Sequence, residues 1–256
     1  MFNDKVVLIT GASSGIGAAC AFTFAKSSAS LALVGRNLDN LNKIAKQCEK
    51  LNQLKPLIIV ADITVDKDLD RIAEETVSKY GKIDVLINNA GVNSVSPTNT
   101  PAEAFDRVMT TNLRGTYLLT SKITPYLTKT KGNIVNISSI LSNKPLPMMA
   151  PYCMSKAALD MFTKCTALQL GPKGVRVNAV NPGPVKTELF RRGGMTDGDC
   201  ERMFLGIELS SPLKKITKGE DVAELVLFLA SDRASCINGS CYVIDCGLLL
   251  GDAGNL

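Results

Sequence analysis

Histidine is absent from this 256-residue chain. Its absence excludes Ser-His-Asp and Cys-His hydrolytic sites, and it also excludes the common zinc sites that combine cysteine with histidine. Any acid–base chemistry must therefore use tyrosine, lysine, cysteine, aspartate or glutamate side chains. We expect no metal site.

Long hydrophobic runs are also missing. No apolar stretch approaches the roughly 20 residues that a membrane span needs. The first five residues lead directly into an apolar run at 6–10, which leaves no space for a signal peptide. We therefore expect a cytoplasmic protein that does not contact a membrane.

The eight cysteines form no C-x-x-C pair. Thiols of cytoplasmic proteins are normally reduced, and free cysteine is among the most often buried residue types. The sequence therefore predicts thiols that are mostly buried, not a disulfide framework.

Positive charge is present but not concentrated. The net charge is +5, and the densest basic pairs are Arg191-Arg192 and Lys214-Lys215. This distribution gives little support to a nucleic-acid surface, and a polyanionic small ligand accounts for a few of the cations equally well. We expect no nucleic-acid partner.

Predicted strands and helices alternate along the chain, with no linker and no internal repeat. This pattern predicts an α/β protein with one doubly wound domain over residues 1–256. A helical region at about 102–127 contains Asn112 at its middle, which favours a kink or a backbone group freed to hold water over a merely tolerated polar residue. The polar, glycine-containing segment 187–212 fits neither kind of element, and its length predicts a substrate lid.

A glycine-rich turn separates the apolar run at 6–10 from a helical stretch at 18–27, and it reads Gly11-Ala12-Ser13-Ser14-Gly15-Ile16-Gly17. Glycines let backbone N–H groups approach oxygen atoms, and the start of a helix attracts anions. A lone glycine turn is often only a turn. Its place between the first strand and the first helix nevertheless predicts a phosphate cradle for a dinucleotide.

The second predicted strand, 31–34, ends in Gly35-Arg36-Asn37. NAD-binding folds often place a carboxylate here to bind the ribose 2′-hydroxyl. A carboxylate would repel a 2′-phosphate, whereas a guanidinium binds one through two hydrogen bonds. The sequence therefore predicts NADP(H), the alternative being a solvated arginine.

The turn Asn88-Asn89-Ala90-Gly91 follows a strand predicted at 83–87. Its small residues let a cofactor pass close to the backbone, and its asparagines can tie neighbouring strands together.

Tyr152 and Lys156 are four residues apart within a helix predicted at about 151–170. This spacing places both side chains on one helix face. A nearby ammonium group stabilises a phenolate, so we expect the pKa of Tyr152 to fall below its usual value of about 10. Ser139 follows a strand predicted at 134–137, at the edge of the sheet where ligands bind in such folds.

Together these residues resemble the short-chain dehydrogenase/reductase family, over nearly the whole chain. The motifs occur in family order and at family spacing, and they are Thr10 to Gly17, Asn88 to Gly91, Asn112, Ser139 with Tyr152-x-x-x-Lys156, and Asn181-Pro182-Gly183. The resemblance implies a Rossmann-like parallel sheet with helices on both faces and a nicotinamide cofactor. It also implies hydride transfer between a carbonyl and an alcohol, and a homotetramer.

The resemblance further implies a role for each matching residue. Tyr152 would donate a proton to the carbonyl oxygen, and Ser139 would hydrogen-bond that oxygen. Lys156 would bind the nicotinamide ribose and lower the pKa of Tyr152, while Asn112 would hold a water on the proton path. The residues expected to bind the cofactor are Gly11, Ser13, Ser14, Gly15, Ile16, Gly17, Arg36, Asn37, Asp62, Ile63, Asn89, Ala90, Gly91, Tyr152, Lys156, Pro182, Gly183, Val185 and Thr187.

The chain departs from the family pattern at two places. Family members often have Asp-Gly-Gly where this chain has Asp245-Cys246-Gly247, which affects the expected packing of the tail and a tetramer contact. Many NADP-using members carry a basic residue at the position of Ser14, so Arg36 is left as the main phosphate cation.

Two apolar stretches should form the substrate pocket, and their residues are Leu141, Leu146, Met148, Met149, Leu189, Phe190, Met195, Met203, Phe204 and Leu205. Methionine fits irregular apolar shapes, so we expect a bulky lipophilic or steroid-like ketone, although such methionines can also be core packing. One alternative is a 3-oxoacyl thioester on an acidic carrier, with Arg191 and Arg192 as a basic rim. Another is a cofactor-binding regulator without catalysis.

Overall fold

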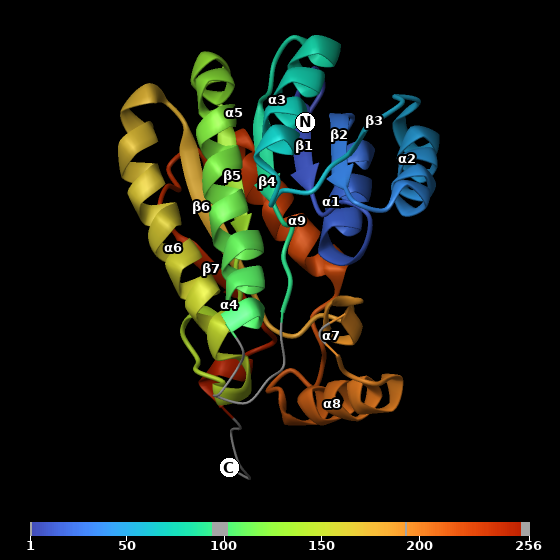
Figure 1. Cartoon of the computed structure of the whole chain (residues 1–256), viewed down its shortest axis with the longest axis vertical. Coiled ribbons are helices and arrows are strands. Elements are labelled where there is room, and N and C mark those ends of the chain that lie inside the picture. Colours follow the sequence, from blue (N-terminus) through green and yellow to red (C-terminus); the bar gives the residue numbers. More distant parts are fainter. Residues whose placement is uncertain (1, 94–101, 193, 252–256) are drawn as a thin grey trace.

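The computed structural model describes residues 2–93, 102–192 and 194–251. Its centre is a parallel sheet in which seven strands follow the order β3-β2-β1-β4-β5-β6-β7 (Figure 1). The strands are β1 Val6–Thr10, β2 Ser30–Gly35, β3 Leu57–Val60, β4 Val85–Asn88, β5 Asn133–Ile137, β6 Arg176–Pro182 and β7 Cys241–Ile244. The order reverses between β1 and β4, which opens a crevice at the carboxyl ends of these two strands. The predicted fold class is confirmed.

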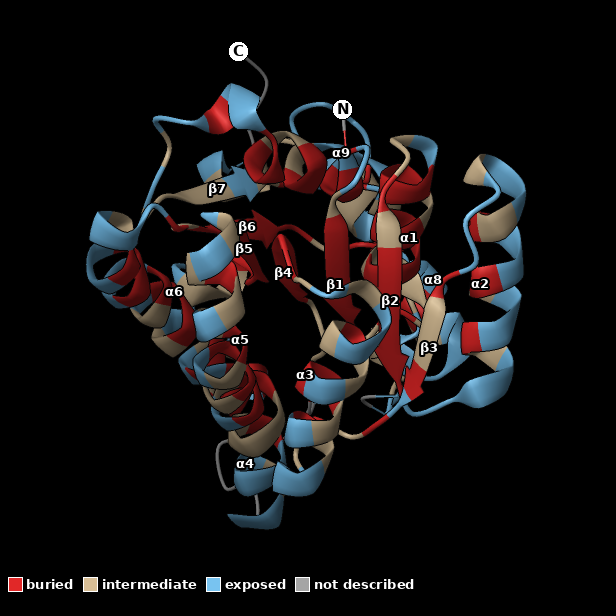
Figure 2. Cartoon of the chain, turned by 90° about the horizontal axis from the view of Figure 1, so that it is seen from above, coloured by how far each residue is buried: buried red, intermediate tan, exposed pale blue. Residues whose placement is uncertain are grey.

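Helices cover both faces of this sheet because its strands bury side chains on both sides (Figure 2). Val7 and Ile9 pack with one helix layer, and Leu8 packs with the other. The first layer contains α1 Gly15–Lys26, α2 Leu38–Asn52 and α9 Gly219–Ala230. The second contains α3 Asp66–Tyr80, α5 Thr116–Thr130 and α6 Ala150–Leu170.

The helical region around Asn112 is interrupted as the sequence predicts. Between α4, Ala102–Met109, and α5 lies a six-residue π-helix, η1 Thr110–Gly115. Gly115 sits against the backbone carbonyl of Ile63, where a β-carbon would collide with the oxygen. Asn112 is only 1% exposed, and its side chain is hydrogen-bonded to the backbone of Val92, which follows β4.

The segment that the sequence leaves unassigned contains two helices, α7 Leu189–Arg192 and α8 Asp197–Ser210. Both lie beyond the carboxyl ends of the strands, in the lower right of Figure 1. Their packing is local: the rings of Phe190 and Phe204 meet edge to face with centroids 5.5 Å apart. The segment 187–212, which the sequence predicts to be a lid, is therefore mainly helical and not an irregular loop.

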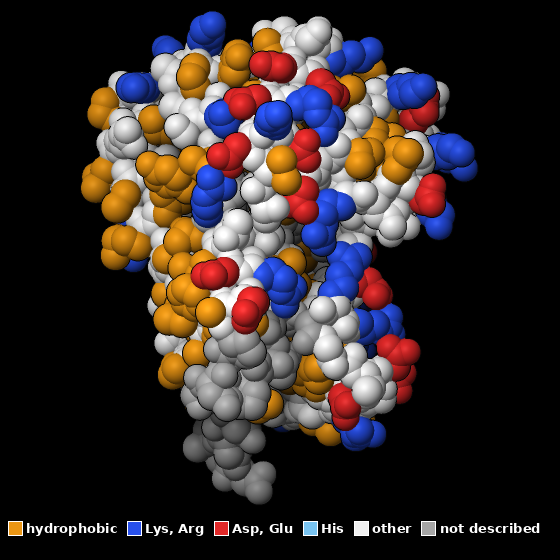
Figure 3. Space-filling view, viewed as in Figure 1, with side chains coloured by type: hydrophobic (Ala, Val, Ile, Leu, Met, Phe, Trp, Pro, Cys, Tyr) orange, Lys and Arg blue, Asp and Glu red, His pale blue; other side chains and the backbone are white. Residues whose placement is uncertain are grey.

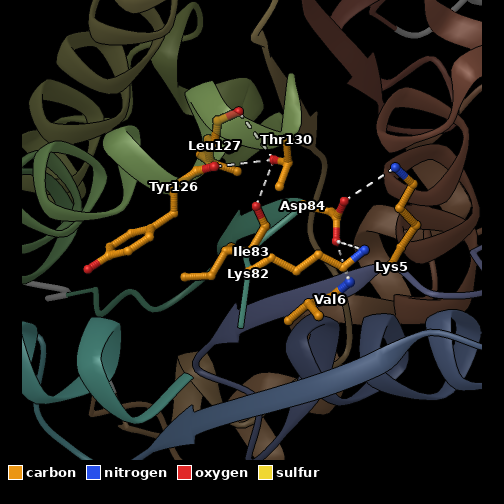
Figure 4. Close-up of polar contacts among 8 residues, drawn as sticks. All are labelled: Lys5, Val6, Lys82, Ile83, Asp84, Tyr126, Leu127 and Thr130. Atoms are coloured by element: carbon orange, nitrogen blue, oxygen red, sulfur yellow. Dashed lines mark hydrogen bonds and ion pairs between the residues drawn. The ribbon is translucent and has the colours of Figure 1, made fainter. Parts of the chain in front are cut away.

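At the amino ends of the strands, Asp84 holds two neighbouring strands together (Figure 4). Its side chain is 5% exposed, and its carboxylate accepts the backbone N–H of Val6 at 2.9 Å. Lys5 and Lys82 form ion pairs with the same carboxylate at 3.3 and 3.4 Å. These contacts join the starts of β1 and β4, so both strands reach the crevice from a fixed base.

The cysteine prediction is partly wrong. All eight thiols are free, but only Cys20, Cys48 and Cys200 are buried. The others lie on or near the surface because helix positions such as Cys165 face away from the sheet.

None of the helices in the described ranges is both long and apolar enough to cross a membrane.

Candidate active site

The turn between β1 and α1 has the backbone shape of an anion cradle. Gly11 and Gly15 have φ angles of +65° and +56°, in the left-handed region that other residues rarely adopt. A β-carbon at Gly11 would lie 2.8 Å from Nδ2 of Asn89, and one at Gly15 would lie 2.9 Å from Cγ2 of Thr187. Only glycine leaves this turn open, and the start of α1 favours an anion there.

Asn89 holds the two loops at the reversal point together. Its Nδ2 donates to the carbonyls of Thr10 at 2.9 Å and Gly11 at 3.2 Å. The backbone N–H groups of Asn89 and Ala90 both donate to Oγ1 of Thr10 at 3.0 Å. One residue earlier, at the end of β4, Nδ2 of Asn88 donates to Oδ1 of Asn136 on β5 at 2.9 Å. The prediction that these asparagines tie neighbouring strands is confirmed.

The end of β2 presents one cation and no carboxylate of its own. Arg36 is exposed and forms an ion pair with Asp62 at 3.4 Å. Burial would raise the pKa of Asp62, but hydrogen bonds from Thr64 and the charge of Arg36 hold that pKa below its usual value. Arg36 can swing away from this partly exposed pair at little cost, because such pairs contribute about 0–1 kcal/mol.

Two of the predicted cofactor residues make structural contacts outside the cavity. Gly17 packs behind the turn, against the carbonyl of Gly11. Oδ1 of Asn37 accepts the N–H of Asn40 at 2.8 Å and so caps α2. Neither residue lines the cavity, whereas the other predicted cofactor residues do.

Ser139, Tyr152 and Lys156 meet at the far end of the same cavity. The side chain of Ser139 lies close enough to the phenol of Tyr152 to lower its pKa, and Oγ of Ser139 accepts the N–H of Leu141 at 3.1 Å. Nζ of Lys156 donates to the backbone carbonyl of Ile137 at 2.7 Å and lies 5.6 Å from the centre of the Tyr152 ring. Burial lowers the pKa of Lys156 to about 8, against the opposing charge of Asp160 one helical turn further on.

The expectation of a lowered tyrosine pKa is wrong for this geometry. Burial raises the pKa of Tyr152 to about 12, and the nearby Ser139 side chain offsets only part of this. The ammonium group of Lys156 faces the ring and a backbone carbonyl, so it does not stabilise a phenolate directly. A neutral phenol is the form that can donate a proton.

Asn112 lies beside this group but uses its side chain elsewhere. Its Oδ1 accepts the N–H of Val92 at 2.8 Å. Its Nδ2 donates to the carbonyl of Val92 at 2.9 Å and to Oγ of Ser155 at 3.0 Å. Both amide protons are therefore in use, so a water on the proton path would have to donate to Oδ1, which accepts one further hydrogen bond, or to a backbone carbonyl of the π-helix.

The start of the Ser139 loop is fixed by β6. Nδ2 of Asn181 lies 2.7 Å from the buried carboxylate of Asp160 and 2.9 Å from Oγ of Ser142. The same atom lies 3.2 Å from the carbonyl of Ser139. The asparagine of the predicted Asn-Pro-Gly motif thus positions the serine loop against α6.

The cavity between these two ends has a volume of about 630 Å³, within the roughly 300–1,000 Å³ of small-molecule sites. A glycine cradle, a cation at the end of β2 and small residues at 89–91 suit a long dinucleotide, so the donor set fits the predicted cofactor. Pro182, Gly183, Val185 and Thr187 line the same cavity.

The predicted substrate walls are largely present. Eight of the ten residues line the cavity, and they are Leu141, Leu146, Met148, Met149, Leu189, Phe190, Met195 and Met203. Phe204 and Leu205 instead line a separate, smaller cavity. Sequence reasoning missed Lys144 and Leu248, which also line the main cavity, and it considered Arg192 only as part of a basic rim. For these three, no local motif signals a position beside the cofactor.

The chain is similar to known oxidoreductases along nearly its full length. Residues 11–249 match a family model described as Enoyl-(Acyl carrier protein) reductase. The 3-oxoacyl-(acyl-carrier-protein) reductase of Thermotoga maritima is 36% identical over 249 residues, which cover 96% of this chain and 98% of that protein.

Two solved structures share the whole fold. A short-chain dehydrogenase/reductase of unknown function from Caenorhabditis elegans, solved with cofactor, superimposes with a TM-score of 0.93 at 33% identity, covering 99% of this chain and 97% of that one. A 7α-hydroxysteroid dehydrogenase in complex with NADH and 7-oxo glycochenodeoxycholic acid gives 0.90 at 30% identity, covering 96% and 94%.

Proposed function

The chain belongs to the short-chain dehydrogenase/reductase family, and from this premise we propose that it is an NADPH-dependent oxidoreductase that reduces a ketone to a secondary alcohol, reversibly. The substrate is a bulky lipophilic or steroid-like carbonyl compound. One observation carries the proposal: Ser139, Tyr152 and Lys156 close one end of a cavity whose other end is the glycine cradle.

The chain's own groups manage the proton and the developing charge. Tyr152, held neutral by burial, donates its proton to the carbonyl oxygen. The hydroxyl of Ser139 hydrogen-bonds the same oxygen as negative charge develops on it. Lys156, with its ammonium 5.6 Å from the phenol ring, supplies positive charge to this end of the cavity and binds a ribose. The nicotinamide cofactor supplies the hydride.

The experiment that tests the reaction is a panel of ketones and secondary alcohols, followed by the absorbance of the reduced nicotinamide. We expect reduction of lipophilic ketones with NADPH. A purified, folded protein that binds NADPH but turns over no member of the panel would instead support the regulator hypothesis.

Preference for NADP(H) rests on Arg36 and on the glycine that precedes it. Gly35 offers no carboxylate for a ribose 2′-hydroxyl, and Arg36 lines the cavity next to its ion-pair partner Asp62. Replacing Gly35→Asp together with Arg36→Leu removes a phosphate contact and adds a ribose acceptor, so preference should move toward NADH. If the wild-type protein already binds NADH more tightly than NADPH, the assignment fails.

A 3-oxoacyl thioester is the second candidate substrate, favoured by the similarity to the Thermotoga reductase. An acidic carrier needs a basic rim, but Arg191 forms ion pairs with Glu188 at 2.9 Å and Asp197 at 2.6 Å. Much of its charge is thereby offset, which favours a neutral ketone. Raising the ionic strength should leave the KM of a ketone unchanged, whereas a carrier-bound substrate should bind more weakly.

We also propose a homotetramer. Apolar side chains gather on one side of the molecule, over α5 and α6, along the left edge of Figure 3. Tyr117, Met154, Met161 and Leu168 are 48–82% exposed on these helices. Patches of this kind often mark protein interfaces. Light scattering should give four chains per particle, and Met161→Glu with Leu168→Glu should reduce that number; a wild-type monomer would contradict the proposal.

A further inference from the structure

Arg192 is the last residue of α7, yet its guanidinium reaches the glycine cradle. Its Nη2 lies 3.4 Å from Oγ of Ser14, across a sequence separation of 178 residues. Arg192 also lines the main cavity. Its neighbour Arg191 points elsewhere and pairs with Glu188 and Asp197. Within the described ranges, no carboxylate lies within ion-pairing distance of Arg192.

Ser14 lines the cavity at the start of α1. It is the N-cap of α1, but its hydroxyl makes no capping hydrogen bond, so it is free to face the cavity. The adjacent Ser13 packs against the end of β2, because a β-carbon built on Gly35 would lie 3.4 Å from its Oγ. The end of β2 at Gly35 and the serines of the cradle therefore line neighbouring parts of the cavity.

Two arginines from different parts of the fold thus line the cavity. Arg36 comes from the end of β2, and Arg192 comes from the helical segment after β6. A dianionic phosphate binds best where two cations can each form charge-assisted hydrogen bonds.

We propose that Arg192 is a specificity-determining residue that binds the 2′-phosphate of NADPH together with Arg36. This inference rests on the proposed function and identifies the second cation of its cofactor site. The segment 187–212 then supplies a charge that the cradle itself lacks at Ser14.

The same contact couples the two halves of the cavity. Arg192 shares the four-residue helix α7 with Leu189 and Phe190, which line the substrate end. A phosphate held by Arg192 therefore fixes these two apolar side chains. The ketone should show a lower KM with NADPH than with NADH, and Arg192→Ala should remove that difference.

The direct test measures binding of two nucleotides by calorimetry, with no turnover involved. Adenosine 2′,5′-bisphosphate and 5′-AMP differ only in the 2′-phosphate. Arg192→Ala should weaken the bisphosphate about 10- to 100-fold, as expected for one lost charge-assisted hydrogen-bonding partner, and leave 5′-AMP within about twofold. Arg192→Lys should retain part of the affinity, because lysine keeps the charge without the planar fork.

Arg191→Ala is the matched control, because it removes the adjacent arginine, which pairs with Glu188 and Asp197 instead. It should change neither affinity. Equal weakening of both nucleotides by Arg192→Ala would assign the residue to the 5′-phosphate and overturn the proposal, as would unchanged affinity for both. A wild-type protein without preference for the bisphosphate would instead refute the NADP(H) assignment itself. Thermal melting confirms that each variant is folded, and substitution of the exposed Arg192 should not shift it.

Discussion

Replacing Asn112 by alanine should damage stability and cofactor binding together. Three hydrogen bonds would be lost, two to the backbone of Val92 and one to Ser155. The substitution leaves the N–H and carbonyl of Val92 without their partner, at about 1–3 kcal/mol for each unpaired buried group. Because Val92 is only partly buried, water can satisfy some of this demand, so we expect about 2–4 kcal/mol.

The expected loss translates into a fall in Tm of about 4–16 °C for a protein of this size. The functional effect follows from Gly91, which lies between the two side chains: a β-carbon there would be 3.4 Å from Oδ1 of Asn112 and 3.7 Å from Nζ of Lys156. Once segment 89–92 loosens, the cofactor loses part of its support, so its dissociation constant should rise.

The assay pairs thermal melting with equilibrium binding of NADPH. Ser155→Ala is the control: it removes the contact with Asn112 and the bond that Ser155 donates to the carbonyl of Tyr152, but leaves Val92 paired. It should cost clearly less stability than Asn112→Ala. If the Asn112→Ala protein melts within 1–2 °C of wild type and binds NADPH normally, the positioning role assigned to Asn112 is refuted.

Three further outcomes follow from the site and from its base. Tyr152→Phe should lower kcat by about 10²–10⁴-fold with little change in Tm, whereas the same substitution at the exposed Tyr117 should leave kcat unchanged; near-normal turnover of the first variant would remove Tyr152 as proton donor. Because Lys156 is charged below its pKa of about 8, reductase kcat/KM should be level below that pH and fall above it. Asp160→Asn removes a charge that raises this pKa, so it should move the fall to lower pH. A profile that stays level to pH 10 would contradict this. Asp84→Ala should lower stability by about 1–3 kcal/mol through the unpaired N–H of Val6, while kcat at a temperature below melting stays unchanged.

The sequence predicts those parts of the site that depend on neighbouring residues. The glycine turn, the strand ends and the spacing of Tyr152 and Lys156 on α6 are local patterns, and each lies where the pattern predicts. The reversal of strand order then brings these patterns to one crevice, which the fold class already implies.

What the sequence did not reveal depends on distance or on burial. The contact between Arg192 and Ser14 joins residues that are 178 positions apart, so no short window of sequence contains both. The pKa of Tyr152 depends on how deeply the phenol is buried, and four-residue spacing carries no information about depth. The contacts of Asn112 were not predictable for a similar reason, because its partner Val92 is set by tertiary packing.

The π-helix at Thr110–Gly115 has a consequence for changes in chain length. Each residue of an α-helix advances the side-chain direction by about 100°, so deleting one residue to restore regular α geometry would rotate everything after it by about that angle relative to α4. Either Asn112 would turn away from Val92 or the exposed face of α5 that carries Tyr117 would turn toward the sheet. Single-residue insertions and deletions between 102 and 130 should therefore be tolerated far less well than substitutions.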